Sequence, residues 1–487
     1  MKIVPQALTR QMLSLKKLLN YSNRLQHSLW FVPVLCTLGG VMVAILMLWL
    51  DHTLKRSWED FFWLETTANG AQTVLSTIAG GMITVAGIVL SMEMVTLSIT
   101  SSQFGSRVLR SRLGDRTTQW TIGAFMGTAV YSLVVLKMVR KLGEDNFFIP
   151  HLSVMAAILF ALGSLMILLY FIHHVAMIAQ APEIVASLAT DLRHSMERIF
   201  PDKIGDPPPK VNSHLREVTD EEWDSLKNGI TIESTREGYI QGIEGDDLIA
   251  LAVQHNLIIE LPKRPGDFLS TGETMARVAV QEKIDQTKVA HAINEAFFIG
   301  NNRTPWQDVN CSVHELSQMG VRALSPGIND PYTAVNCIDR LSSALAQLSQ
   351  RQMPAANRFD HDGHLRLIVD RQTFSSVMHA AFDQIRSYAV NSAAVSQRLM
   401  EGYQRIADAV THEDHAADVL HQARLTMEGA LEQPHHPADL KIIQEQYERL
   451  TKQLEPLLEK KEDPQADQNP VDEESNEEGE ASGEVIG

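Results

Sequence analysis

Apolar residues are concentrated in the first 180 positions of this 487-residue chain, where long apolar runs are separated by short polar segments. Four of these runs reach the length of about 20 residues that an apolar helix needs to cross a bilayer. They span residues 29–50, 73–92, 120–139 and 151–171. The first run is longer than the apolar core of a signal peptide and no clear small-residue cleavage site follows it, so we expect it to be retained.

Basic residues indicate how the spans are oriented. They gather before the first run (Lys2, Arg10, Lys16, Lys17 and Arg24) and between the second and third runs (Arg107, Arg110, Arg112 and Arg116). The other loops carry fewer uncompensated positive charges. The positive-inside rule therefore predicts that both termini are cytoplasmic.

Beyond residue 180 the chain becomes more polar and the period of its pattern changes. Residues 175–200 are predicted to continue the fourth span as an amphipathic helix. The unit 181–209 is expected to hold the end of this helix and a proline-rich linker at 206–209. Short apolar runs separated by Gly, Pro and Asp predict a small β-module at 210–281, with an inserted helix at 246–253. This order resembles the barrel-sandwich hybrid of lipoyl and biotinyl carriers. The exposed lysine motif of a swinging-arm carrier is absent from the sequence.

Helical periodicity dominates residues 282–460. A threonine at 304 and an Asn-Asp pair at 329–330, each followed by proline, predict helices running through residues 318 and 348. Further helices are expected at 373–409, 412–432 and 437–460, after a short strand at 365–369. The predicted fold class is an α-helical multi-pass membrane protein with a cytoplasmic α+β region: basic segment 1–28, membrane domain 29–180, β-module and helical domain.

The net charge of −17 comes largely from the end of the chain. Residues 462–487 contain ten acidic side chains and no lysine or arginine. Such a segment is typical of a disordered, solvated tail, predicted here for 461–487. The net charge therefore indicates no particular partner, and the basic residues beside the spans give no support for nucleic-acid binding.

Small residues recur along the second span. Ser76, Gly80 and Thr84 lie four residues apart, with Gly81 in an adjacent row, and Gly123 and Gly127 form a similar pair in the third span. In lipid, such rows allow close helix packing, within a bundle or between subunits. The alternative is that this face of the second span lines a polar pathway. Glu93 would then contribute a charge, although it also fits a solvated position at the inner interface.

The segment 301–340 combines charged residues with turn-forming prolines and glycines, as functional loops often do. Its charged and amide residues of interest are Arg303, Asp308, Arg322, Asn329 and Asp330. Free amides at a predicted helix start, with an arginine nearby, would suit a phosphate or carboxylate. The simpler interpretation is an ion-pair network that fixes a corner between two helices.

The chain lacks the motifs of the common catalytic and cofactor sites. There is no HExxH, Walker loop, GxSxG or GxGxxG after a strand. The histidine pairs 173–174, 412/415 and 435–436 do not supply a complete ligand set, and Cys36, Cys311 and Cys337 lack CxxC spacing. We therefore expect no enzymatic activity, no metal and no cofactor.

Several motifs together resemble a family of bacterial predicted membrane proteins, number 2254 of the domains of unknown function. They are SSQFGSRVLRSRLGDRTTQW (101–120), YFIHHVAMIAQ (170–180), GYIQGIEGDDL (238–248), RPGDFLSTGE (264–273) and the segment 301–340. A proline would be expected where Gly105 and Ser106 stand. The resemblance implies a multi-pass protein of the bacterial inner membrane and supplies no established activity.

Two functions remain open from the sequence. The first is a channel-like or transport-related homo-oligomer in the lipid bilayer, with the second span lining or gating a path for an ion. The alternative is a membrane-anchored sensor or scaffold that binds a small anion or a protein through residues 322–330, without transport.

Overall fold

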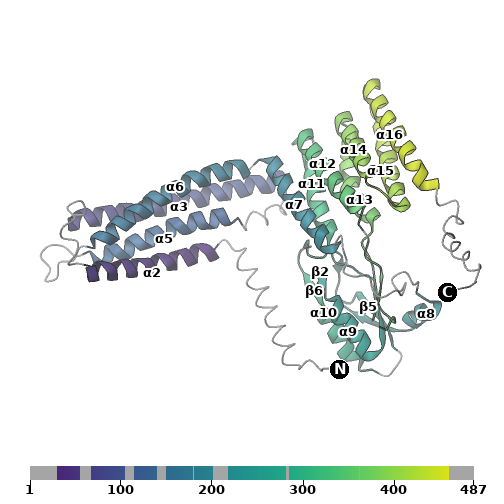
Figure 1. The fold of residues 1–487 in the computed structure, drawn as a ribbon, viewed down its shortest axis with the longest axis horizontal. Helices are drawn as coiled ribbons and strands as arrows, with labels where there is room; N and C mark the ends of the chain where they lie inside the picture. Colours follow the sequence, from purple (N-terminus) through teal and green to yellow (C-terminus); the bar gives the residue numbers. More distant parts are fainter. Residues whose placement is uncertain are drawn as a thin grey trace, which may run out of the picture.

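A computed structural model describes residues 30–54, 67–104, 115–139, 150–178, 180–200, 218–280, 284–351, 353–360 and 362–459. The basic segment 1–28, the linker, the loop between the second and third spans and the acidic tail lie largely or wholly outside these ranges. The described chain forms a bundle of four long helices and a C-terminal region of helices and strands beside one end of the bundle (Figure 1). We call that end of the bundle proximal and the other end distal.

The bundle consists of α2 (Phe31–Leu54), α3 (Ala68–Phe104), α5 (Arg116–Met138) and α6 (His151–Ile178). Each helix is long and apolar enough to cross a membrane, so all four are candidate spans, as expected from the four apolar runs. The second helix is much longer than the expected 73–92. With 37 residues, α3 is about 55 Å long, whereas the hydrocarbon core of a bilayer is about 30 Å thick.

The third span, α5, is the centre of the bundle and packs against the other three helices. It is the most buried of the four and also the least apolar. A Cβ at Gly123 would lie 2.8 Å from Sγ of Cys36 on α2, and one at Gly40 would lie 2.5 Å from the carbonyl oxygen of Gly127. The glycines of α5 therefore allow α2 to approach its backbone.

Polar groups connect the helices at the distal end. The Asp51 carboxylate of α2 accepts hydrogen bonds from the backbone amides of Leu152 (3.0 Å) and Ser153 (2.9 Å), at the start of α6. Tyr131 of α5 donates its hydroxyl to the carbonyl of Ser153 at 2.9 Å. Asp51 thus provides the cap that α6 does not find in its own sequence.

The chain leaves the bundle through α7 (Ala181–Ile199), a helix separate from α6. We expected one continuous helix over 175–200; instead α7 has its own N-cap at Gln180, with Pro182 in its first turn. Proline lacks the amide that a continuing helix would need, but it suits a first turn. The apolar face of α7 packs against α11 (Val309–Ala323) and α12 (Pro331–Leu348).

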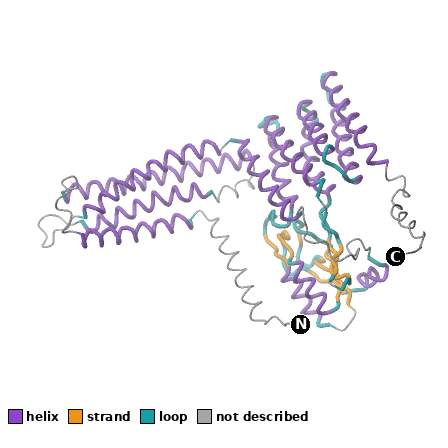
Figure 2. Tube along the Cα trace, in the orientation of Figure 1, coloured by secondary structure: helices purple, strands orange, loops and turns teal. Residues whose placement is uncertain are grey.

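Strands form two sheets in the C-terminal region (Figure 2). The larger has the order β1 (Ile230–Glu233), β5 (Thr274–Val280), β3 (Leu257–Leu261), β8 (Leu365–Val369), β7 (Asn357–Phe359). The smaller has the order β4 (Phe268–Leu269), β2 (Gly238–Ile243), β6 (Phe297–Gly300). Three helices accompany them: α8 (Asp220–Lys227), α9 (Gly245–His255), which the sequence predicted as the inserted helix, and α10 (Gln286–Ala296).

The β-rich part extends beyond residue 281, the boundary expected from the sequence. β8 pairs in parallel with β3, with Ile259 opposite Leu367, and antiparallel with β7. β8 is nearly continuously buried, as a strand inside a sheet should be. The sheets thus hold together segments about a hundred residues apart, while the likeness to a barrel-sandwich hybrid stays a prediction.

The remaining helices are α13 (Phe374–Ala389), α14 (Ala393–Ala407), α15 (Glu413–Leu431) and α16 (Pro437–Leu458). They share one large core with α7, α11 and α12. The expected helix at 373–409 is two helices, because the chain turns at 390–392. The carbonyl of Ala389 accepts from the Ser392 amide at 2.8 Å and from the Ser396 hydroxyl at 3.1 Å. The second predicted helix start is confirmed, since α12 begins at Pro331 with Asp330 as its N-cap.

The first predicted helix start is wrong. Helix α11 begins at Val309, with Asp308 as its N-cap, and not at Thr304. Residues before it lie along β2 instead: the Gln307 side chain accepts from the amide of Ile243 at 2.8 Å and donates to its carbonyl at 3.2 Å. These tertiary contacts outweigh the local preference of Thr-Pro for a helix start.

Candidate functional site

Helix α3 presents two different faces, and the residues predicted to form a pathway are divided between them. One face is buried in the bundle and repeats every three or four residues: Ala71, Leu75, Ala79, Met82, Ala86, Val89, Glu93, Leu97 and Thr100. Ser76, Gly80, Gly81 and Thr84 are exposed on the other side. The four small residues and Glu93 therefore do not line a common surface within one chain.

The small residues on the exposed side of α3 need no polar partner from another helix. The hydroxyls of Ser76 and Thr84 donate to carbonyls of their own helix, at Thr73 (3.0 Å) and Gly80 (2.9 Å). A Cβ added at Gly80, Gly81 or Gly87 would meet no atom within 4 Å. Such a surface can face lipid or receive a closely packed helix.

Glu93 lies in the buried stripe, with only 8% of its surface exposed. At the distal end, Gln72 of α3 donates to the carbonyl of Val139 of α5 at 3.3 Å. Glu93 and Thr118 each lie about 31 Å from that contact, measured along their own helix, so the two residues are at the same height along the bundle axis. The carboxylate thus belongs to a polar layer at the proximal end of the bundle.

Asp115, His174 and Gln119 belong to the same end. Asp115 caps α5 through the amides of Thr117 and Thr118, and its carboxylate lies 3.1 Å from Nε2 of His174 on α6. Gln119 is fully buried, and its side-chain amide has no hydrogen-bond partner in the described part of the chain. Asp115 was not predicted from the sequence, although an aspartate just before two threonines and an apolar run is a recognisable N-cap signal.

The segment 301–340 contains two separate polar clusters. At the start of α11, Nε and Nη2 of Arg303 donate to one oxygen of the Asp308 carboxylate, at 2.9 and 2.6 Å. Asp308 is almost completely buried, and this burial raises the pKa of its carboxyl, while Arg303 opposes the rise. Gly266, with a φ of +100°, closes over the pair: a Cβ there would lie 2.4 Å from the Asp308 carboxylate.

The other cluster lies at the opposite end of α11, about 22 Å away. Asp330 accepts from the amide of Thr333 at 3.1 Å and from its hydroxyl at 2.5 Å. Asn329 adopts a left-handed conformation with a φ of 48° and forms the turn before α12. Arg322 is exposed and donates to the carbonyl of Ser102, near the end of α3, at 3.4 Å.

The five polar residues of 301–340 therefore do not converge on one ligand. Arg303 and Asp308 form a buried ion pair between the β-rich part and α11. The Asp330 carboxylate already caps α12 through the Thr333 amide, and its negative charge at this helix start disfavours an external anion. Arg322 joins the C-terminal region to the bundle.

A metal-type group occurs in the turn between β7 and β8. Ligand atoms of Asp360, Asp362 and His364 lie within 4.8 Å of one another. The Asp360 carboxylate, however, already accepts from Arg366 at 2.7 Å and from the backbone amides of Asp362 and His364. Although partial burial acts in the opposite direction, these donors hold the pKa of Asp360 below its usual value, as in an ion-paired turn.

Comparison with known proteins agrees with this architecture. A family described as predicted membrane protein, DUF2254, matches residues 26–405, and the chain belongs to this family. An uncharacterized protein of Mycobacterium bovis and one of Mycobacterium tuberculosis are each 27% identical over 402 residues, which covers 79% of this chain and 72% of each relative. No solved structure matches the chain.

Proposed function

We propose that this DUF2254 membrane protein is a homo-oligomer with a channel-like function in the bacterial inner membrane. In this proposal α3 of each subunit packs against its neighbours and lines or gates the path. The C-terminal region lies in the cytoplasm and regulates the path. The observation that carries the proposal is the exposed small-residue face of α3, a bundle helix that also contacts α11.

The exposed face supports subunit packing. Glycines without neighbours let a second helix approach closely, and the self-bonded hydroxyls add no desolvation cost. If this face lines the path, the path is narrow and without charge along Ser76, Gly80, Gly81 and Thr84. Glu93 would act from the buried stripe, by fixing the position of α3 inside each subunit.

The length of α3 supports regulation. A helix of about 55 Å crosses the bilayer with more than 20 Å to spare. The extra length contacts α11, through Arg322 and Ser102 among others. A shift of α11 would therefore act directly on the helix that is proposed to gate the path.

Ion flux into proteoliposomes tests the proposal. We expect the full-length protein to pass common monovalent ions faster than empty vesicles do, with or without membrane tension. Leucines at Gly80 and Gly81 should lower the flux by about tenfold or more, and should dissociate the oligomer seen by native mass spectrometry. The matched control is Gly163→Leu on α6, also exposed and without atoms within 4 Å, which should preserve both.

Two outcomes would overturn the proposal. One is flux equal to that of empty vesicles across all ions and tensions for a folded oligomer. The other is equal loss in the α3 and α6 variants, which would assign the effect to added bulk. Glu93→Gln tests the buried stripe separately: we expect reduced flux with an unchanged oligomer.

The sensor alternative has less support. It needs an anion site at residues 322–330, where the Asp330 carboxylate caps the Thr333 amide of α12 and Arg322 contacts α3. The sensor alternative would be restored if a phosphate or carboxylate ligand raised the melting temperature of the protein and this effect depended on Arg322.

A further inference from the structure

We propose that α3 of one subunit packs in parallel against α3 of a second copy of this chain, along a seam that continues out of the bilayer to Ile99. This inference rests on the proposed homo-oligomer and specifies its interface. It is carried by the part of α3 that extends beyond the hydrocarbon core, where lipid tails cannot cover an apolar surface.

Two exposed tryptophans of α2 mark the limits of the hydrocarbon core. Trp30, at the proximal end, and Trp49, at the distal end, are 75% and 62% exposed. They are 19 positions apart in the sequence, which in a helix is about 28 Å and close to the core thickness of about 30 Å. Tryptophan side chains favour the two membrane–water interfaces, so Trp30 lies at the proximal limit of the core.

The heights of neighbouring helices carry this limit over to α3. A Cβ at Gly123 of α5 would contact Sγ of Cys36, and Trp30 lies six residues before Cys36 on the parallel helix α2. Trp30 is therefore level with residue 117 of α5, next to Thr118, which is at the height of Glu93. The residues of α3 after Glu93 lie outside the core. This segment, 94–104, is about 16 Å long, and we call it the overhang.

Exposed residues on the outer side of α3 form a seam that runs from the core into the overhang. Positions three or four residues apart lie on one side of a helix, and rows with such spacing pack against each other in parallel helix pairs. The exposed residues with this spacing are Thr77, Gly81, Thr84, Ile88, Met92, Val95 and Ile99.

The seam changes character where it leaves the core. Inside the core it begins with small residues, which allow two helices to approach closely. In the overhang it consists of Val95 and Ile99, which are 56% and 51% exposed. Headgroups and water replace lipid tails at this height, so covering these two apolar side chains with another helix is favourable.

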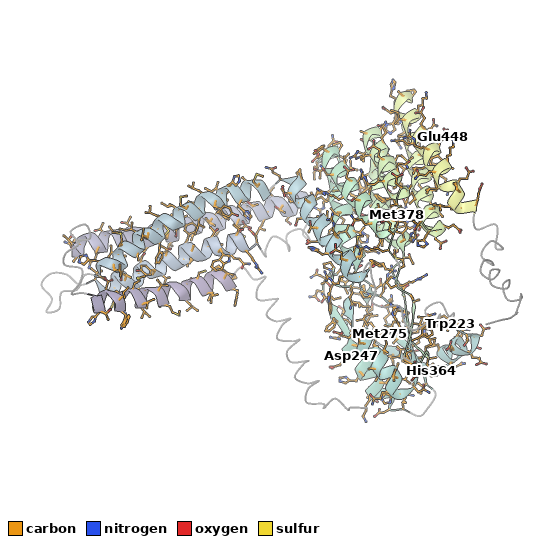
Figure 3. All side chains as sticks on the ribbon, viewed as in Figure 1. Trp223, Asp247, Met275, His364, Met378 and Glu448 are labelled. Carbon is orange, nitrogen blue, oxygen red and sulfur yellow. The ribbon has the colours of Figure 1, made fainter. Side chains whose placement is uncertain are left out.

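The described part of the chain leaves the overhang seam open. Outside the bundle, α11 makes the main contact with α3, and Arg322 of α11 donates to the carbonyl of Ser102 at 3.4 Å. Val95 and Ile99 remain exposed beside this contact. In Figure 3, Met378 of α13 lies away from the bundle, so the inner layers of the helical domain do not cover the overhang.

A second copy of α3 fits the seam by symmetry. Subunits of a homo-oligomer in one membrane share one orientation, so their α3 helices are parallel and like residues meet at the same height. The glycine and threonines set the close approach within the core, and the apolar pair continues the contact outside it. The seam ends beside Ser102, so the contact of Arg322 connects the C-terminal region to the subunit interface.

Disulfide cross-linking of the full-length protein in proteoliposomes, at a high ratio of lipid to protein, tests this interface. Val95→Cys and Ile99→Cys are compared with Met94→Cys, a position that is 64% exposed and about 100° around the helix from Val95. We expect both seam variants to form dimers several-fold faster than Met94→Cys under a mild oxidant, because a parallel contact brings like Cα atoms within disulfide range. The unsubstituted chain, with its three native cysteines, gives the background rate.

A charge at the seam provides a second measurement. Ile99→Lys should shift the oligomer seen by native mass spectrometry towards the monomer, because two like charges would meet at one height. Met94→Lys adds the same charge off the seam and should leave the oligomer unchanged. Thermal melting shows that both variants are folded.

Three results would refute this interface. They are equal cross-linking rates at 94, 95 and 99 in an oligomeric protein, an unchanged oligomer in folded Ile99→Lys, and slow labelling of Ile99→Cys by a water-soluble maleimide without cross-linking. The last result would assign the cover to another segment of the same chain. Flux separates this inference from the channel-like function: seam cross-links without flux remove only the function, and flux without seam cross-links removes only the interface.

Discussion

At the residue scale, the contact between Gly266 and the Asp308 carboxylate shows how one backbone conformation protects a buried charge. The pair of Asp308 and Arg303 is shielded on one side by a turn whose glycine has a φ of +100°. Removing one member of such a buried pair leaves the other charge uncompensated. The turn is therefore part of what keeps the charge pair out of water.

Gly266→Ala tests this arrangement against Gly272→Ala. Both glycines have positive φ, +100° and +81°, so both substitutions carry the left-handed backbone cost of about 1–2 kcal/mol. Only at position 266 does the new Cβ meet an atom, 2.4 Å from Asp308, whereas position 272 is open. We expect Gly266→Ala to lose about 1–3 kcal/mol more stability than Gly272→Ala, measured by thermal melting in detergent. Equal melting temperatures would show that the turn does not constrain the ion pair.

At the element scale, glycine positions distinguish the buried contact of α2 from the free face of α3. Gly40 and Gly127 put two backbones in contact, and no side chain can yield there. Gly39, the neighbouring residue, faces open space. The two positions share a helix and a sequence context, and they differ only in what a Cβ would meet.

We therefore expect Gly40→Ala to separate α2 from α5 and to lower the melting temperature by several degrees, equivalent to about 1–3 kcal/mol. Gly39→Ala should leave it unchanged or slightly higher. The measurement is thermal melting of both variants in one detergent, followed by size-exclusion chromatography. A stable Gly40→Ala protein would contradict the close approach of the two helices.

At the scale of the whole molecule, α3 and α7 connect the bundle to the C-terminal region. Arg322→Glu should weaken the contact with the last turns of α3. We expect faster amide hydrogen exchange in residues 96–104, with little change at the distal end of the bundle. Arg340→Glu, an exposed change on α12, is the control for added negative charge. Equal exchange in the two variants would mean that α11 does not restrain α3.

The sequence predicted the elements whose signals are local, and it was wrong where distant contacts decide. Four apolar runs and the Asp330–Pro331 helix start needed no tertiary information. The helix expected to begin at Thr304 begins later because Gln307 pairs with β2. The break between α13 and α14 at 390–392 has no proline to announce it in the sequence. The five polar residues of 301–340 are close in sequence, yet α11 separates them into two clusters.

The central position of α5 has a consequence for biogenesis. It is the least apolar of the four spans, and the other three helices cover it on several sides. A single helix of that composition, presented alone to lipid as it emerges from the ribosome, partitions into the bilayer less readily than its neighbours do. Its glycines and threonines become favourable only against α2, α3 and α6. We therefore expect α5 to insert cooperatively, by packing against α2 and α3 that are already in the membrane.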